Sequence, residues 1–134
     1  MFAAIKRNLL KSVMLADGAV SLVAGAGLVA LASPVASLLG PAATPASVTA
    51  VGLFLLGWGA FHLATGWAPQ PRANAVRIAI LGDAAWVAAS GAVLFVGGQH
   101  LSALGMVIIA VVAVAVLDIM FLKMAGRRRQ VLAT

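Results

Sequence analysis

The sequence has no cysteine and no tyrosine, and only three of its 134 residues are acidic. Without cysteine there are no disulfides, no thiolate metal ligands and no cysteine nucleophile. Charged residues make up 9% of the chain and hydrophobic residues 63%, whereas about a quarter of a soluble domain is charged. A chain this short buries only about two thirds of its surface on folding, so water is a poor solvent for this composition. We therefore expect a single membrane domain over residues 1–134.

The apolar residues gather in runs long enough to cross a membrane. About 20 predominantly apolar residues span the hydrocarbon core as a helix, and Pro- and Gly-rich stretches separate four such runs. These runs cover residues 12–32, 48–67, 76–97 and 102–122. The sequence therefore predicts an all-α membrane protein, a four-transmembrane-helix bundle made of two helical hairpins.

The first run has an alternative interpretation as a secretory signal. Basic residues precede it, and its end at residues 30–32 resembles a cleavage site. The run is longer than the apolar part of a usual signal, it contains Asp17, and its pattern recurs later in the chain. These features favour a membrane span.

All nine basic residues fall on one side of this topology, and the loops at 33–47 and 98–101 on the other side have none. They are Lys6, Arg7 and Lys11 before the first span, Arg72 and Arg77 between the second and third, and Lys123, Arg127, Arg128 and Arg129 at the end. The positive-inside rule predicts that both termini, including a short basic tail at 127–134, are cytoplasmic. A basic rim against anionic lipid accounts for the net charge of +6, so we expect no nucleic-acid partner.

The two hairpins also resemble each other in sequence. When the chain is shifted by 66 residues, Asn8, Lys11 and Asp17 align with Asn74, Arg77 and Asp83. We therefore predict two tandem repeats, at about 6–68 and about 72–126, that enter the membrane in the same direction and are parallel. This arrangement places the two aspartates at equal depth.

The few ionisable residues inside the predicted spans lie at similar depths. All three carboxylates, Asp17, Asp83 and Asp118, lie five or six residues from a basic residue, which is roughly 7 to 9 Å along a helix. His62 lies at a similar depth on the second span. Because a carboxylate in hydrocarbon is costly, we predict that these four residues form one intramembrane polar layer, shielded from lipid, in the cytoplasmic half.

Small residues lie on the same helical faces as this layer. Membrane helices approach each other closely where such residues line up, so the polar side chains are expected to point toward neighbouring helices. The predicted helix-packing residues are Ser21, Gly25, Gly52, Gly59, Gly66, Ser90 and Gly91.

The polar layer has three interpretations. It ties the bundle together through hydrogen bonds, it handles protons or cations, or its three aspartates and His62 hold a metal as hard ligands. No paired histidines on one helix support the last interpretation, so we expect no metal and no cofactor. The sequence has no nucleophile with a base partner, no phosphate loop and no dinucleotide fingerprint, and we expect no enzyme activity.

Several short motifs resemble those of a protein group. The chain resembles a diffuse group of small, uncharacterised four-span bacterial inner-membrane proteins. The resemblance rests on Asp83, Ala84, Ala85, Trp86 and Val87 with Ser90, on Leu101, Ser102, Ala103, Leu104 and Gly105, and on Gly126, Arg127 and Arg128. It covers most of the chain and implies the fold and a multi-pass location in the bacterial inner (plasma) membrane, but no function.

Two functional hypotheses follow. The first is a non-enzymatic accessory or interaction subunit that packs against a larger membrane complex or against copies of itself, with Trp58 and Trp86 as contact surface. The second is a small transporter or channel for protons or cations in which Asp17 and Asp83 exchange ligands. Four short helices enclose little room, so this transporter would dimerise. The expected partners are the lipid bilayer and another membrane protein or a second copy.

Overall fold

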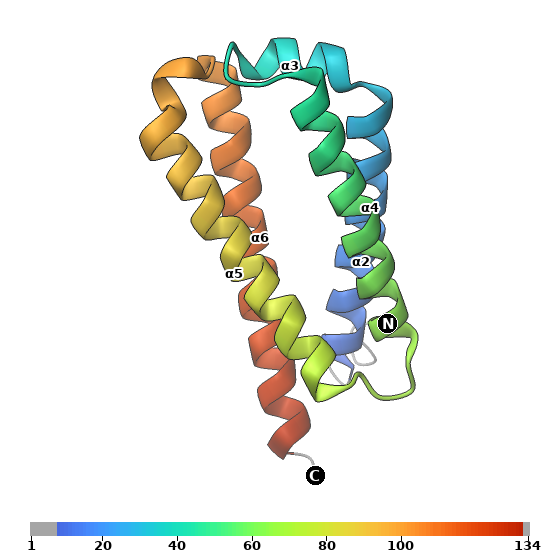
Figure 1. The fold of residues 1–134 in the computed structure, drawn as a ribbon. Helices are drawn as coiled ribbons and strands as arrows, with labels where there is room; N and C mark the ends of the chain where they lie inside the picture. The colour runs from blue at the N-terminus through green and yellow to red at the C-terminus, as the bar shows by residue number, and fades with distance from the viewer. Residues whose placement is uncertain (1–7, 133–134) are drawn as a thin grey trace.

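The computed structural model describes residues 8–132, and this part of the chain is helical with no strand. The four long helices are α2 (Leu9–Ala30), α4 (Pro45–Trp67), α5 (Ala73–Gly97) and α6 (Ala103–Leu132). A short helix, α3 (Ala32–Leu39), and a 3-10 turn, η1 (Gly98–His100), lie at the other end of the molecule from the chain ends (Figure 1). All four long helices are long and apolar enough to cross a membrane. The expected all-helical architecture with four candidate spans is confirmed.

The long helices pair as two hairpins. Helix α2 packs closely along α4, and α5 packs along α6. The hairpins lie close together toward the chain ends and diverge toward α3 (Figure 1). The first hairpin carries α3 between its long helices, whereas the second has only η1. The internal duplication stays a prediction.

Glycine brings α2 and α4 into backbone contact. A β-carbon added at Gly25 would lie 2.7 Å from the carbonyl oxygen of Gly52, and one added at Gly59 would lie 2.8 Å from that of Gly18. Only glycine permits such a close approach. The predicted packing residues on these two helices, Ser21, Gly25, Gly52, Gly59 and Gly66, are all buried.

The packing prediction does not hold on α5. Gly91 is exposed with nothing within 4 Å of an added β-carbon, and Ser90 is half-buried. The hairpins diverge at this level, so α5 has no close neighbour in the first hairpin there. Its tight contact lies nearer the chain ends, where the ring of Trp58 packs against Gly82.

Two segments differ from the boundaries expected from sequence. The predicted loop at 33–47 contains α3, because Pro34 lies in the first turn of that helix, where its missing N–H costs no helical hydrogen bond. Helix α6 continues past residue 122 to Leu132, so the predicted basic tail is helical through 132. Residues 133–134 of that tail lie outside the described residues.

The hairpins are also joined at the α3 end. The Ser102 N–H donates to the carbonyl of Leu39 at 2.8 Å, and the Ser102 hydroxyl accepts from the N–H of Gly105 at 2.8 Å. Ser102 thus caps the start of α6 and fixes it to the end of α3. Gly40 makes the turn after α3 with a φ of 107°, a conformation that favours glycine.

Candidate functional site: a buried polar cluster

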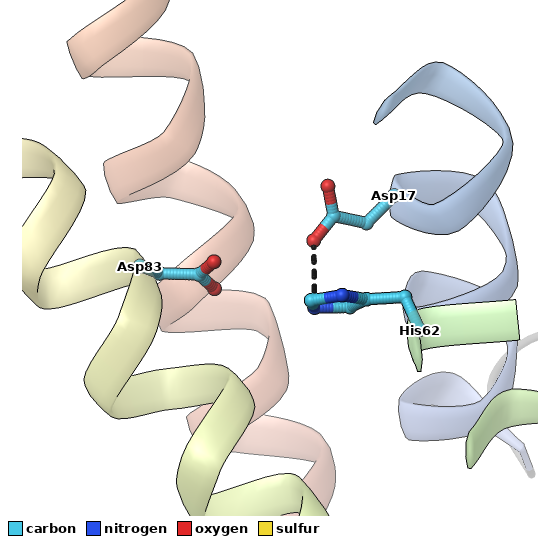
Figure 2. Close-up of side chains that lie close together, drawn as sticks. All are labelled: Asp17, His62 and Asp83. Atoms are coloured by element: carbon cyan, nitrogen blue, oxygen red, sulfur yellow. Dashed lines mark ion pairs between the residues drawn. The ribbon is translucent and has the colours of Figure 1, made fainter. Parts of the chain in front are cut away.

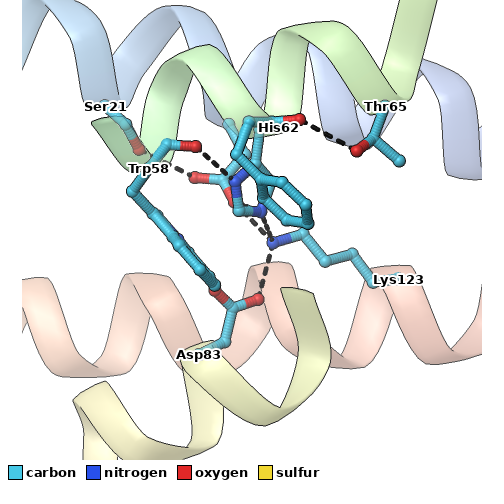
Figure 3. Close-up of polar contacts among 8 residues, drawn as sticks. Ser21, Trp58, His62, Thr65, Asp83 and Lys123 are labelled. Atoms are coloured by element: carbon cyan, nitrogen blue, oxygen red, sulfur yellow. Dashed lines mark hydrogen bonds and ion pairs between the residues drawn. The ribbon is translucent and has the colours of Figure 1, made fainter. Parts of the chain in front are cut away.

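The four long helices meet at the ammonium of Lys123, which is fully buried on α6. Its Nζ lies 2.5 Å from Oδ2 of Asp17, 2.6 Å from Oδ2 of Asp83 and 2.8 Å from Nε2 of His62 (Figure 3). An ammonium has three N–H donors, and three acceptors surround this one. We call Asp17, His62, Asp83 and Lys123 the polar cluster, to which each long helix contributes one residue.

Local helix geometry brings these side chains together. The backbone contact between Gly18 and Gly59 lies next to Asp17 and one turn from His62, so the two polar residues lie side by side. Side chains on a helix lean toward its N-terminus. Because α6 runs toward the end of the molecule that carries both chain ends, the long side chain of Lys123 leans back toward the middle of the bundle.

The ring of His62 is oriented by its own helix. Its Nδ1 lies 2.9 Å from the carbonyl oxygen of Trp58, and a carbonyl only accepts, so we assign a hydrogen to Nδ1. In the neutral ring, Nε2 then presents a lone pair to the Lys123 ammonium. The same Nε2 lies 3.2 Å from Oδ2 of Asp17 (Figure 2). Nε2 of the neutral ring and Oδ2 of the carboxylate both accept hydrogen bonds, so a proton placed between them would form a hydrogen bond from one to the other.

The formal charges of the polar cluster do not cancel. Ionised Asp17 and Asp83 with a charged Lys123 and a neutral His62 sum to one negative charge. A net charge inside an apolar bundle is costly. One further proton, shared between Nε2 of His62 and Oδ2 of Asp17, makes the polar cluster neutral. The two acceptor atoms 3.2 Å apart are the candidate position for such a proton.

Access to the polar cluster is greatest at Asp17. Its side chain is 12% exposed, compared with 4% for Asp83 and 0% for His62 and Lys123. The hydroxyl of Ser21 donates to Oδ1 of Asp17 at 3.4 Å. Asp17 is therefore the member of the cluster through which exchange with the surroundings is easiest.

Aromatic rings cover another side of the polar cluster. The rings of Phe54, Trp58 and Phe61 stack in a row, and Trp58 contacts the His62 ring edge-on with centroids 4.8 Å apart. Figure 3 shows the Trp58 side chain reaching toward Asp83. The indole Nε1 of Trp86, which stacks on Phe54, is the one buried side-chain donor without a partner among residues 8–132. The rings make an apolar wall beside the charged groups.

Three members of the polar cluster also match a metal-ligand set. One donor atom each from Asp17, His62 and Asp83 lies within 4.8 Å of the other two, and carboxylate with imidazole suits several divalent metals. Here the Lys123 ammonium lies within hydrogen-bond distance of all three donors. The lysine thus takes the place of a bound cation in this arrangement. The expectation of no metal stays a prediction.

The structure brings together three of the four residues of the predicted polar layer and leaves Asp118 outside. Asp118 is exposed on α6. It lies five residues before Lys123, about 140° away around a helix of 3.6 residues per turn. Once Lys123 faces the polar cluster, Asp118 must face outward, and its predicted place in the layer is wrong.

The predicted basic rim loses Lys123, which is buried rather than exposed. Half-buried Lys11 donates to the carbonyl of Ala68 at 3.3 Å, at the end of the molecule that carries the chain ends. The exposed members of the rim in the described residues are Arg72, Arg77, Arg127, Arg128 and Arg129. Lys6 and Arg7 lie outside the described residues.

Comparison of the chain with protein-family models, with curated proteins and with solved structures gave no match. The resemblance to small four-span bacterial inner-membrane proteins therefore stays a prediction. Functional inference rests on the geometry of the polar cluster.

Proposed function

We propose that the chain is a non-enzymatic, multi-pass membrane protein whose polar cluster binds and releases one proton. In this function it is a small transporter or channel for protons or cations. The observation that carries the proposal is the meeting of Asp17, Asp83 and His62 at one buried ammonium. Two acceptor atoms of this site, Nε2 of His62 and Oδ2 of Asp17, lie 3.2 Å apart. We place the protein in a bacterial inner membrane because its motifs resemble those of small four-span bacterial proteins. We place both termini in the cytoplasm because the exposed arginines lie at the start of α5 and near the end of α6.

Protonation changes the contacts of Lys123. A proton between His62 and Asp17 occupies the Nε2 lone pair, so one N–H of the ammonium loses its acceptor. The same proton adds a bond between α4 and α2. Binding therefore tightens the first hairpin internally and weakens its hold on α6, and release reverses both effects. Asp17 is the most exposed member, so its carboxylate is where the proton exchanges, and the exchange changes the contacts between the two hairpins.

The test measures proton flux in vesicles that contain the purified protein. A pH-sensitive dye inside the vesicles follows flux after a pH step. We expect the parent protein to give pH-dependent flux. Asp17→Asn combined with Asp83→Asn should abolish it, because an amide side chain neither ionises nor takes up a proton near neutral pH. Ser37→Ala, an exposed change on α3, serves as the control and keeps the parental flux. No flux in the parent, or unchanged flux in the double variant, would remove the proposal.

The second candidate is an accessory or interaction subunit, and the position of Asp118 favours it. This carboxylate is exposed on an apolar helix, nine residues before the arginines of the rim begin at Arg127, roughly 13 Å along the helix. A carboxylate facing lipid at such depth costs a few kcal/mol or more, so a protein surface that covers it is stabilising. Purification from native membranes in mild detergent should give a defined complex or homo-oligomer. A monodisperse monomer contradicts this function.

A further inference from the structure

The outward face of α6 carries an apolar stripe with one carboxylate in it. We call this stripe the α6 seam, and its spacing alternates between three and four residues, as in a coiled-coil heptad. The α6 seam consists of Leu104, Val107, Val111, Val114, Asp118 and Phe121. Its five apolar side chains are 51% to 62% exposed, whereas Met106, Ile108, Val112 and Leu122 on other faces of α6 are 38% to 46% exposed. The seam is thus the most exposed large apolar stripe on this helix.

The α6 seam points away from the rest of the bundle. The buried residues of α6 are Gly105, Lys123 and Gly126, and they contact α3, the polar cluster and α2. At about 100° per residue, the seam lies on the opposite side of α6 from these residues. The seam is therefore free to contact another molecule while the hairpins stay as they are.

We propose that the α6 seam binds the α6 seam of a second copy of this chain, so that two parallel α6 helices form a symmetric dimer contact. Two copies inserted in the same orientation present Asp118 at the same depth without any adjustment. Across a two-fold axis along the membrane normal, residue meets the same residue, so the carboxyl group of one copy meets that of the other. This proposal rests on the interaction function and gives it a defined partner.

The paired Asp118 side chains explain why a carboxylate lies in an apolar stripe. A protonated carboxyl donates its O–H to an oxygen of the other copy, and such interhelical bonds between polar groups stabilise membrane helix pairs. A single polar residue in a heptad seam also fixes which residues lie opposite each other. The valines at three of the remaining positions are β-branched and pack well in two-stranded contacts. Chemistry and spacing thus favour self-association.

The first test uses the absence of cysteine from the chain, which makes every introduced thiol unique. Single cysteines at Val107, Val111 and Val114 should give oxidised dimers in the membrane. A cysteine at Val112 serves as the matched control, because it is also exposed but lies across the helix from the seam. Cross-linking confined to the seam supports the proposal. Equal cross-linking at Val112, or none at any position, would overturn it.

The second test separates the role of Asp118 from helix packing. Asp118→Asn keeps both a donor and an acceptor, and we expect it to dimerise as the parent does. Asp118→Leu removes both, and we expect its dimer dissociation constant in detergent to rise about tenfold, corresponding to the 1–2 kcal/mol of an interhelical polar bond. Helical circular dichroism checks that the variants fold. Equal dissociation constants for all three proteins contradict the Asp118 pair. Another outcome is that the seam cysteines give no cross-linked dimer while a different protein co-purifies with the chain. That outcome contradicts self-association but leaves the interaction function standing.

Discussion

Replacing Lys123 with methionine lowers the free energy of unfolding by about 3 to 5 kcal/mol, the cost of removing one partner from a buried charge pair. Methionine fills most of the lysine's volume, so the loss comes from charge rather than from a cavity. Two carboxylates and His62 then face one another without the ammonium that now bonds to all three. Equilibrium unfolding in mixed micelles measures the change.

Two further variants separate charge pairing from a general effect of losing a cation. Arg129→Met removes an exposed cation from the same helix, and surface changes of this kind stay within about 0.5 kcal/mol. Adding Asp17→Asn and Asp83→Asn to Lys123→Met should recover part of the stability, because neutral amides need no counter-charge. If Lys123→Met unfolds no more easily than Arg129→Met, Lys123 is not the centre of the polar cluster.

Replacing Gly25 with leucine lowers the free energy of unfolding by about 3 kcal/mol, at the upper part of the usual range for overpacking. A β-carbon there meets the backbone carbonyl of Gly52 at 2.7 Å and the backbone nitrogen of Leu56 at 2.9 Å. Backbone atoms cannot rotate away as side chains do, so α2 and α4 must separate. The same unfolding measurement in mixed micelles checks the effect.

Gly27 provides the matched control on the same helix. An added β-carbon at Gly27 has nothing within 4 Å, so we expect Gly27→Leu to change the free energy of unfolding by less than about 1 kcal/mol, the size of the helix-propensity difference. Equal losses at both positions would show that leucine disturbs α2 itself rather than its contact with α4.

Hydrophobic runs and their spacing were enough to predict the four long helices, since length and apolar composition decide whether a helix can span a membrane. Asp17, His62 and Asp83 converge as their similar depths predicted, and on α2 and α4 the faces of small residues also restricted where the polar side chains could lie. The short helix α3 was missed because the Pro- and Gly-rich stretch after the first span was interpreted as a loop from residue 33 onward, although the first turn of a helix accepts a proline such as Pro34.

Lys123, the central residue of the polar cluster, was assigned to the basic rim because only its position in the chain was considered, and not the direction and length of its side chain. Lys123 follows an apolar run, which is typical of a lysine at the membrane surface. Its side chain leans toward the N-terminus of α6, and because α6 runs toward the end of the molecule with the exposed arginines, this direction points into the bundle. The angle between Lys123 and Asp118 was a signal in the sequence that only one of them can face the cluster. The exposure of Gly91 could not be derived from one helix, because it depends on how far the two hairpins diverge.

The order of the polar cluster along the chain has a consequence for biosynthesis. Asp17, His62 and Asp83 leave the ribosome before Lys123, which lies near the end of the last long helix. In the membrane that we propose for this chain, the first three spans therefore enter the bilayer with two acidic groups that still lack their cation, at a cost of a few kcal/mol each. Helix α6 is the most apolar of the four spans, and it carries the missing cation into the membrane. Completion of the nascent chain thus brings the two buried acids the one cation that they share.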